Sequence, residues 1–181
     1  MAGKGVPAAL YGAFASGTVR ARAFQRHGPA SLLERVNRTL RRRGVEGLFC
    51  TLTFALFDFG QRTMRIGNSG LPYTLHCRAE TGRCETIDLG GLPLGTFDAA
   101  TYDERSVQLA PGDVIVFHTD GISEAHNGKE SFGMTRLHRR IEENASLPAP
   151  RIGEKILEEL DAFMGDAVPD DDVTLVVVKA L

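Results

Sequence analysis

The sequence contains no tryptophan, only three cysteines and no apolar run of the roughly 18 residues that a membrane-spanning helix needs. An odd number of cysteines (Cys50, Cys77 and Cys84) is typical of a reducing compartment rather than of a disulfide scaffold. The first residues also lack the apolar segment of a secretory signal peptide. We therefore expect a cytoplasmic protein without a membrane segment.

The chain has 181 residues, of which 43% are hydrophobic and 24% charged, as in an ordinary single globular domain. Its charge is uneven: residues 1–50 carry a net +7 and residues 51–181 a net −9. A basic front half is one feature of nucleic-acid-binding proteins. However, Arg35, Arg38, Arg41 and Arg42 recur at helical spacing, and no aromatic residue interleaves with them. We interpret them as a solvated helix face and expect no nucleic-acid partner.

Hydrophobic spacing predicts four helices and a group of strands. The helical patterns cover residues 6–17, 31–44, 134–141 and 152–163, with Ser31 expected to cap the second helix and Gly44 to end it. Short runs rich in β-branched or aromatic residues predict strands at 49–57, 63–66, 73–77, 85–89, 105–109, 114–117 and 173–178. Strands grouped in the middle, rather than alternating with helices, indicate an α+β layered fold with antiparallel sheet.

Two acidic segments adjoin strongly apolar predicted strands. Asp120-Gly121 directly follows one strand, and the triplet of residues 170–172 directly precedes another. If these strands are neighbours, Asp120 and an aspartate of the triplet converge, and such carboxylates repel unless a cation lies between them. Oxygen ligands favour Mg²⁺ or Mn²⁺ over zinc. The alternative, which the residue types alone favour, is a turn at Asp120 and a solvated loop at the triplet.

Other candidate groups are weaker. His76, Cys77 and Cys84 lack the paired spacing of a zinc site, so a buried or exposed role outside metal binding is expected. His118 and His126 flank Asp120, which allows either an acid–base role or a structural one.

Several short motifs occur along the chain in a fixed order. They are Gly3-Lys4-Gly5-Val6-Pro7-Ala8-Ala9-Leu10, Gly67-Asn68-Ser69-Gly70, Gly91-Leu92-Pro93-Leu94-Gly95, Leu109-Ala110-Pro111-Gly112-Asp113, Thr119-Asp120-Gly121-Ile122-Ser123-Glu124-Ala125, Phe132-Gly133, Arg136-Leu137 and Asp171-Asp172-Val173-Thr174-Leu175. Over essentially the whole chain this set resembles the SpoIIE/RsbU branch of the bacterial metal-dependent (PPM) Ser/Thr protein phosphatases.

The resemblance implies an α-β-β-α sandwich, with two central antiparallel sheets that are each covered by helices. It implies two Mn²⁺ or Mg²⁺ ions that activate a water, and this water, rather than a side chain, attacks phosphoserine or phosphothreonine. Asp120 and Asp171 fall on metal-ligand aspartates of the family, and Asp172 is the less favoured neighbour. The usual substrates are phosphorylated regulatory proteins, the anti-sigma-factor antagonists, and an upstream sensor domain often controls the phosphatase.

The sequence departs from the family pattern at its N-terminus. In the family a metal-binding aspartate precedes the Gly-Lys-Gly stretch, at the position that would come just before Met1. An earlier strand that supplies another acidic ligand has no counterpart in this chain, and Leu71 stands where the family commonly has histidine. We therefore expect a single phosphatase-like domain, 1–181, that is incomplete at its N-terminus and holds at most one metal weakly. Lack of the N-terminal strand would expose a sheet edge and favour pairing with a second chain, including a homodimer.

Two functions follow as hypotheses. The first is a Mn²⁺- or Mg²⁺-dependent phosphoprotein phosphatase, whose start codon is assigned too far downstream or of which this chain is a fragment. The second is a genuinely shortened, catalytically crippled phosphatase fold that acts as a binding module in a signalling pathway.

Overall fold

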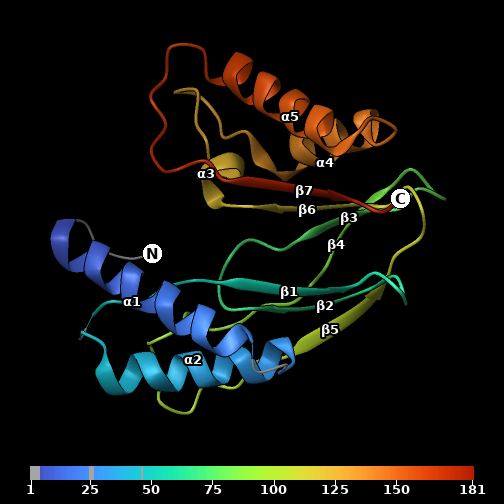
Figure 1. The fold of residues 1–181 in the computed structure, drawn as a ribbon. Helices are drawn as coiled ribbons and strands as arrows, with labels where there is room; N and C mark the ends of the chain where they lie inside the picture. Colours follow the sequence, from blue (N-terminus) through green and yellow to red (C-terminus); the bar gives the residue numbers. More distant parts are fainter. Residues whose placement is uncertain (1–4, 25–26, 46) are drawn as a thin grey trace. The chain divides into compact units, whose positions relative to one another are not determined.

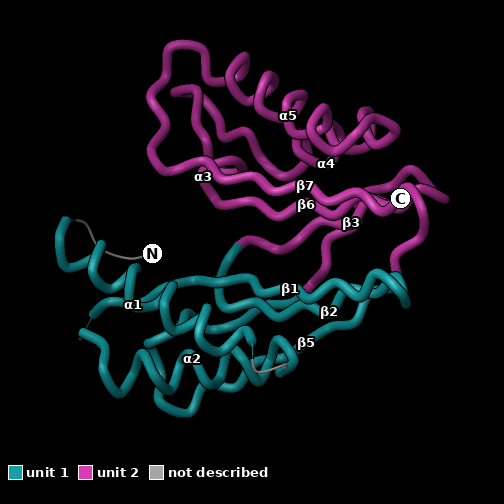
Figure 2. Tube along the Cα trace, viewed as in Figure 1, with its two compact units in different colours: residues 1–71, 89–108 teal, residues 72–88, 109–181 magenta. Residues whose placement is uncertain are grey.

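The computed structural model describes residues 5–24, 27–45 and 47–181 (Figure 1), so Gly3 and Lys4 of the first motif lie outside the described residues. The chain divides into two compact units (Figure 2). Unit 1 comprises residues 1–71 and 89–108, and unit 2 comprises residues 72–88 and 109–181. Each unit contains one antiparallel sheet and its own helices.

Unit 1 is a three-stranded antiparallel sheet with two helices, arranged in the strand order β1-β2-β5. Its elements are α1 (Gly5–Ala23), α2 (Pro29–Arg43), β1 (Thr53–Asp58), β2 (Thr63–Asn68) and β5 (Glu104–Gln108). Helix α2 buries an apolar stripe of Leu32, Leu33, Val36 and Leu40, as its helical spacing predicts.

The expected N-cap of α2, Ser31, was wrong by three residues, because the N-cap is Gly28. The helix begins at Pro29 behind Gly28, because proline is pre-organised for a first helical turn. Ser31 therefore lies inside the helix, where its hydroxyl accepts a hydrogen bond from Arg35 Nε at 3.3 Å. The expected end was right, since Gly44 is the C-cap.

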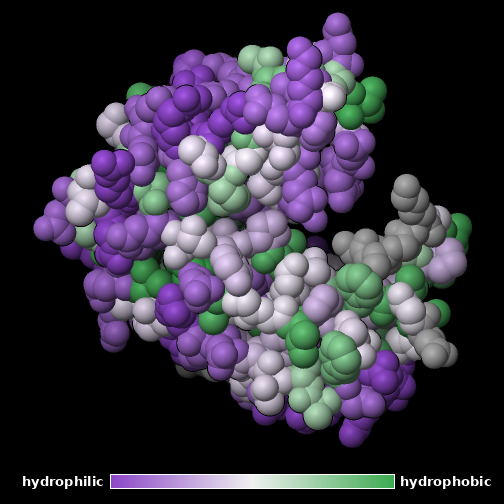
Figure 3. Space-filling view, turned by 180° about the vertical axis from the view of Figure 1, so that it is seen from behind, coloured by the Kyte–Doolittle hydropathy of each residue, from purple (hydrophilic) through white to green (hydrophobic). Residues whose placement is uncertain are grey.

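Unit 2 is a four-stranded antiparallel sheet with the order β4-β3-β6-β7. Its elements are β3 (Leu75–Cys77), β4 (Cys84–Thr86), β6 (Val114–His118), α3 (Asp120–Ser123), α4 (Gly133–Asn144), α5 (Ala149–Met164) and β7 (Leu175–Lys179). Helices α4 and α5 pack their buried faces on this sheet, with Leu137, Ile141, Ile152 and Ile156 in one apolar core. The surface around α4 and α5 is mostly hydrophilic (Figure 3), and it includes ion pairs of Glu159 with Arg139 and Arg140.

The mixed helix and sheet class with two antiparallel sheets is confirmed. The first predicted strand, 49–57, is shorter than expected, because Cys50 pairs outside the sheet in an isolated bridge with Leu94. Within the described ranges, no helix combines the length and the apolar character needed to cross a bilayer.

Candidate metal site

The pairing of β6 with β7 places the two acidic segments at the same end of unit 2. His118, the last residue of β6, lies opposite Leu175, the first residue of β7. The contact continues one step beyond the strands, where the Thr119 amide donates to the Thr174 carbonyl at 3.1 Å. The two strands that adjoin the acidic segments are therefore neighbours, which was the condition for the two segments to converge.

A threonine side chain ties the two segments together. The Thr119 hydroxyl donates a hydrogen bond to the carbonyl oxygen of Asp172 at 3.0 Å. The hydroxyl oxygen of Thr119 also accepts a hydrogen bond from the Thr174 amide at 3.0 Å. Thr119, which directly precedes Asp120, thus holds the backbone of the aspartate triplet beside the start of α3.

Gly121 brings the backbones still closer. A Cβ atom built on Gly121 would lie 2.5 Å from the carbonyl oxygen of Asp172 and 3.2 Å from that of Asp171. The first distance is far below van der Waals contact, so only glycine fits at this position without a shift of the loop. The short helix α3, which begins at Asp120, therefore packs directly against the triplet.

Both candidate carboxylates are anchored locally and open to solvent. Asp120 Oδ1 accepts a hydrogen bond from the Gly121 amide at 3.1 Å, and Asp171 Oδ1 accepts one from the Asp172 amide at 2.7 Å. Neither residue is buried, and the Oδ2 of each has no hydrogen-bond partner among the described residues. One oxygen of each carboxylate therefore orients the group while the other is available to a ligand.

The carboxylates of Asp120 and Asp171 are suited to bind a hard divalent cation as part of its coordination shell. Carboxylate oxygens are the donors that Mg²⁺ and Mn²⁺ prefer, and both ions complete their coordination with water. In the part of the chain that the structure describes, no group of three or more His, Cys, Asp or Glu side chains is gathered closely enough to hold a metal. Asp120 and Asp171 would thus supply two donors, with the remaining positions open.

The two histidines near Asp120 differ in their exposure: His118 is buried, and His126 is exposed. His118 is 4% exposed, and its Nδ1 lies 3.1 Å from the Thr119 carbonyl. Burial lowers the pKa of His118, although the Thr119 carbonyl opposes this shift. His126 Nδ1 accepts the Gly128 amide at 2.9 Å, which shapes the following loop.

A His–Asp pair lies buried in unit 2, between β3 and the turn before β6. His76 Nε2 is 2.8 Å from Asp113 Oδ2, and the amides of Ala79 and Ala110 donate to the same carboxylate. Burial by itself would raise the pKa of Asp113, but the Ala79 and Ala110 hydrogen bonds and His76 bring it below the ordinary value. The only local signal is the Pro-Gly-Asp turn, which carries no information about a partner 37 residues away.

Both cysteines of unit 2 are free thiols. Cys77 and Cys84 are opposite each other in the β3–β4 ladder and are buried in the core of unit 2. Burial raises the pKa of Cys84 to about 12, so its thiol stays protonated.

A family model for Stage II sporulation protein E (SpoIIE) matches residues 1–181. The chain belongs to the SpoIIE family. The predicted relationship to SpoIIE and RsbU is thereby confirmed.

One curated relative of this SpoIIE-family chain is the phosphoserine phosphatase RsbU of Bacillus subtilis (strain 168), which is 23% identical over 177 residues. The match covers 98% of this chain and 52% of RsbU, so the chain spans about half the length of that relative. Protein IcfG of Synechocystis is 26% identical over 136 residues, which are 75% of this chain and 21% of IcfG.

Solved structures show the same fold. The SiaA-PP2C domain of Pseudomonas aeruginosa has a TM-score of 0.84 and 20% identity, covering 98% of this chain and 71% of that one. The manganese-presoaked phosphatase domain of SpoIIE from B. subtilis has a TM-score of 0.64 and 20% identity, covering 83% and 64%. RsbX in complex with magnesium has a TM-score of 0.68 and 18% identity, covering 97% and 75%. The fold of this SpoIIE-family chain is therefore that of PP2C phosphatase domains.

Proposed function

We propose that this chain is the phosphatase part of a metal-dependent protein serine/threonine phosphatase. Its substrate in this proposal is a phosphorylated regulatory protein of the anti-sigma-factor-antagonist type, and Asp120 and Asp171 bind Mn²⁺ or Mg²⁺. Residues 1–181 act as one phosphatase domain in the cytoplasm, under the control of an upstream sensor domain.

The coupling of the Asp120 and Asp171 segments carries this proposal. Thr119 and Gly121 hold the two backbones together in unit 2, and each carboxylate keeps one oxygen free of hydrogen bonds within the described residues. Membership of the SpoIIE family, and a relative described as a phosphoserine phosphatase, support the reaction type. Manganese and magnesium in two related structures support the choice of ion.

The residues of this chain would hold and orient the ion. When bound, a divalent ion lowers the pKa of a coordinated water and neutralises charge on the phosphoryl oxygens. Asp120 would contact it from the start of α3, and Asp171 from the loop before β7. Thr119 would keep the Asp171 loop in place through its two hydrogen bonds, without contacting the phosphate.

Charge removal at each aspartate tests the site. In Asp120→Asn and Asp171→Asn the Oδ1 acceptor that orients the side chain is kept, while the negative charge is lost. We expect Mn²⁺-dependent phosphate release from a phosphoserine protein to fall by about 100-fold or more in each variant. Calorimetric titration with Mn²⁺ should show weaker binding in the same variants.

Asp172→Asn is the matched control, because it removes the neighbouring charge from the same exposed loop. Its activity should stay within about threefold of the wild type, as for a screened surface charge. Full metal-dependent turnover in Asp120→Asn would contradict the assignment. If the wild type releases no phosphate with Mn²⁺ and yet binds the phosphoprotein equally well in a chelator, the binding-module hypothesis replaces the enzyme.

A further inference from the structure

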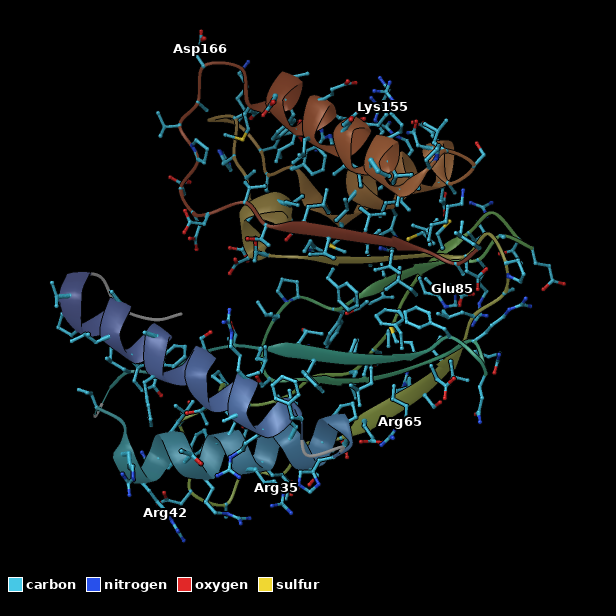
Figure 4. The ribbon with its side chains drawn as sticks, viewed as in Figure 1. Arg35, Arg42, Arg65, Glu85, Lys155 and Asp166 are labelled. Carbon is cyan, nitrogen blue, oxygen red and sulfur yellow. The ribbon has the colours of Figure 1, made fainter. Side chains whose placement is uncertain are left out.

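Five arginines line an open hollow on unit 1. Arg22 comes from α1, and the others come from α2, together with the hydroxyl of Thr39. The hollow has a volume of about 330 Å³, and its arginines are Arg22, Arg35, Arg38, Arg42 and Arg43. We call this feature the arginine hollow; Arg35 and Arg42 mark its position along α2 in Figure 4.

Hydrogen bonds hold part of the arginine hollow in shape. Arg22 Nη2 donates to Thr39 Oγ1 at 3.1 Å, which joins α1 to α2. The Thr39 hydroxyl in turn donates to the Arg35 carbonyl at 2.9 Å, and Arg35 Nε donates to Ser31 Oγ at 3.3 Å. The guanidinium groups are therefore partly pre-organised by neutral partners.

Carboxylates of the described residues pair with other arginines of unit 1, but not with those of the arginine hollow. Elsewhere in unit 1, Arg41 pairs with Asp98 at 2.8 Å and Arg65 pairs with Glu104 at 2.6 Å. Among the described residues, no carboxylate pairs with any of the five arginines of the hollow. Five like charges around one hollow repel each other, so an anion that enters it relieves this repulsion.

We propose that the arginine hollow binds a compact, soluble anion with two or more linked phosphates, such as a nucleoside triphosphate or inorganic polyphosphate. All five cations are arginine, whose planar guanidinium matches phosphate oxygens with two parallel hydrogen bonds. The volume is at the lower end of small-ligand sites, which suits a phosphate chain. None of the described residues that line the hollow is aromatic, so none can stack a series of bases, which disfavours single-stranded nucleic acid.

Calorimetric titration with inorganic tripolyphosphate tests the proposal. The titration is done in a chelator without divalent metal, so its result is independent of the proposed phosphatase site. We expect one ligand per chain, and binding that weakens steeply as salt is raised. The double variant Arg35→Gln/Arg38→Gln should bind about tenfold more weakly or worse, because two charge-assisted contacts are lost.

Arg20→Gln/Arg105→Gln is the matched control, since it removes the same charge from exposed positions of unit 1 outside the hollow. It should bind tripolyphosphate within about twofold of the wild type at about 0.15 M salt. Circular dichroism of both double variants establishes that each is folded.

The proposal is overturned if tripolyphosphate does not bind, if both double variants weaken binding equally, or if sulfate at equal ionic strength competes as well as tripolyphosphate does. Displacement of tripolyphosphate by an oligonucleotide at lower concentration than by ATP would also overturn it, in favour of nucleic acid.

Discussion

Gly121 is the residue whose missing side chain brings the two acidic segments together. In Gly121→Ala, the new methyl group would overlap the Asp172 carbonyl oxygen, so the aspartate loop must move. We expect a loss of about 1–3 kcal/mol in the free energy of unfolding, measured with urea, as for other overpacked sites. Mn²⁺ binding should weaken in the same variant, because the loop carries Asp171.

Gly153 provides the control for this substitution. It lies within α5, and a Cβ there would meet Val177 and Leu175 at ordinary contact distances of 3.8 and 3.9 Å. Gly153→Ala should therefore stabilise the protein by about 0.5–1 kcal/mol through helix propensity. Equal destabilisation by both substitutions would refute the close-approach explanation.

Asp113 links stability to pH through its buried hydrogen bonds. Because its pKa is lowered in the folded protein, it contributes stability above its unfolded pKa of about 3.9 and loses this contribution as the pH falls through the folded value. Asp113→Asn should cost about 1–3 kcal/mol at pH 7, since one of its acceptor oxygens becomes a donor. Urea unfolding should show this difference from the wild type to be constant between about pH 5.5 and 7 and smaller at about pH 3.5. A difference that does not change with pH would contradict this role of the carboxylate.

The residues of the candidate site were predictable to different degrees. Asp120 and Asp171 stand out in the sequence because each belongs to an acidic segment that adjoins a strongly apolar strand. Thr119 does not, since the hydrogen bonds that give it a role are to residues 53 and 55 positions away. The partnership of His76 with Asp113 is hidden for the same reason.

Among the secondary-structure elements, α5 shows how burial alternates along a helix. Ile156 is fully buried in the core of unit 2, whereas its neighbour Leu157 is 38% exposed. Ile156→Ala should destabilise the protein by about 2–5 kcal/mol, since it leaves a cavity under the sheet. Leu157→Ala, measured by the same chemical denaturation, should cost less than about 1 kcal/mol. Similar losses in both variants would mean that α5 does not pack as described.

Helices were easier to predict than strands. The spacing of Leu32, Val36 and Leu40 defines one face of α2 from local sequence alone. The limits of a strand depend on partners elsewhere in the chain. Residues 49–57 are largely apolar throughout, but β1, the strand that pairs with β2, comprises only Thr53–Asp58. Pairing across the sheet, rather than β-propensity, sets where these strands begin and end.

At the scale of the whole molecule, the charge asymmetry of the sequence becomes an asymmetry between units. Unit 1 carries twelve Lys and Arg against six Asp and Glu, and unit 2 carries nine against seventeen. The sequence showed this imbalance as a difference between front and back. It did not show which arginines gather in one hollow, because Arg22 reaches Thr39 only through the packing of α1 against α2.

The antiparallel class of both sheets followed from grouped strands, and the family followed from ordered motifs. The strand order β4-β3-β6-β7 could not be predicted from the sequence, because β7 lies beside β6, which precedes it by more than 50 residues. Such long-range pairing leaves no periodic trace in a single sequence.

That same pairing has a consequence for synthesis on the ribosome. Asp120 is translated some 50 residues before Asp171, and the loop that carries Asp171 acquires its place only when β7 joins β6. Emergence of residues 175–179 from the exit tunnel is therefore the event that brings the two acidic segments together. A nascent chain stalled before that point would already contain Asp120, yet the loop that carries Asp171 would not be held beside it.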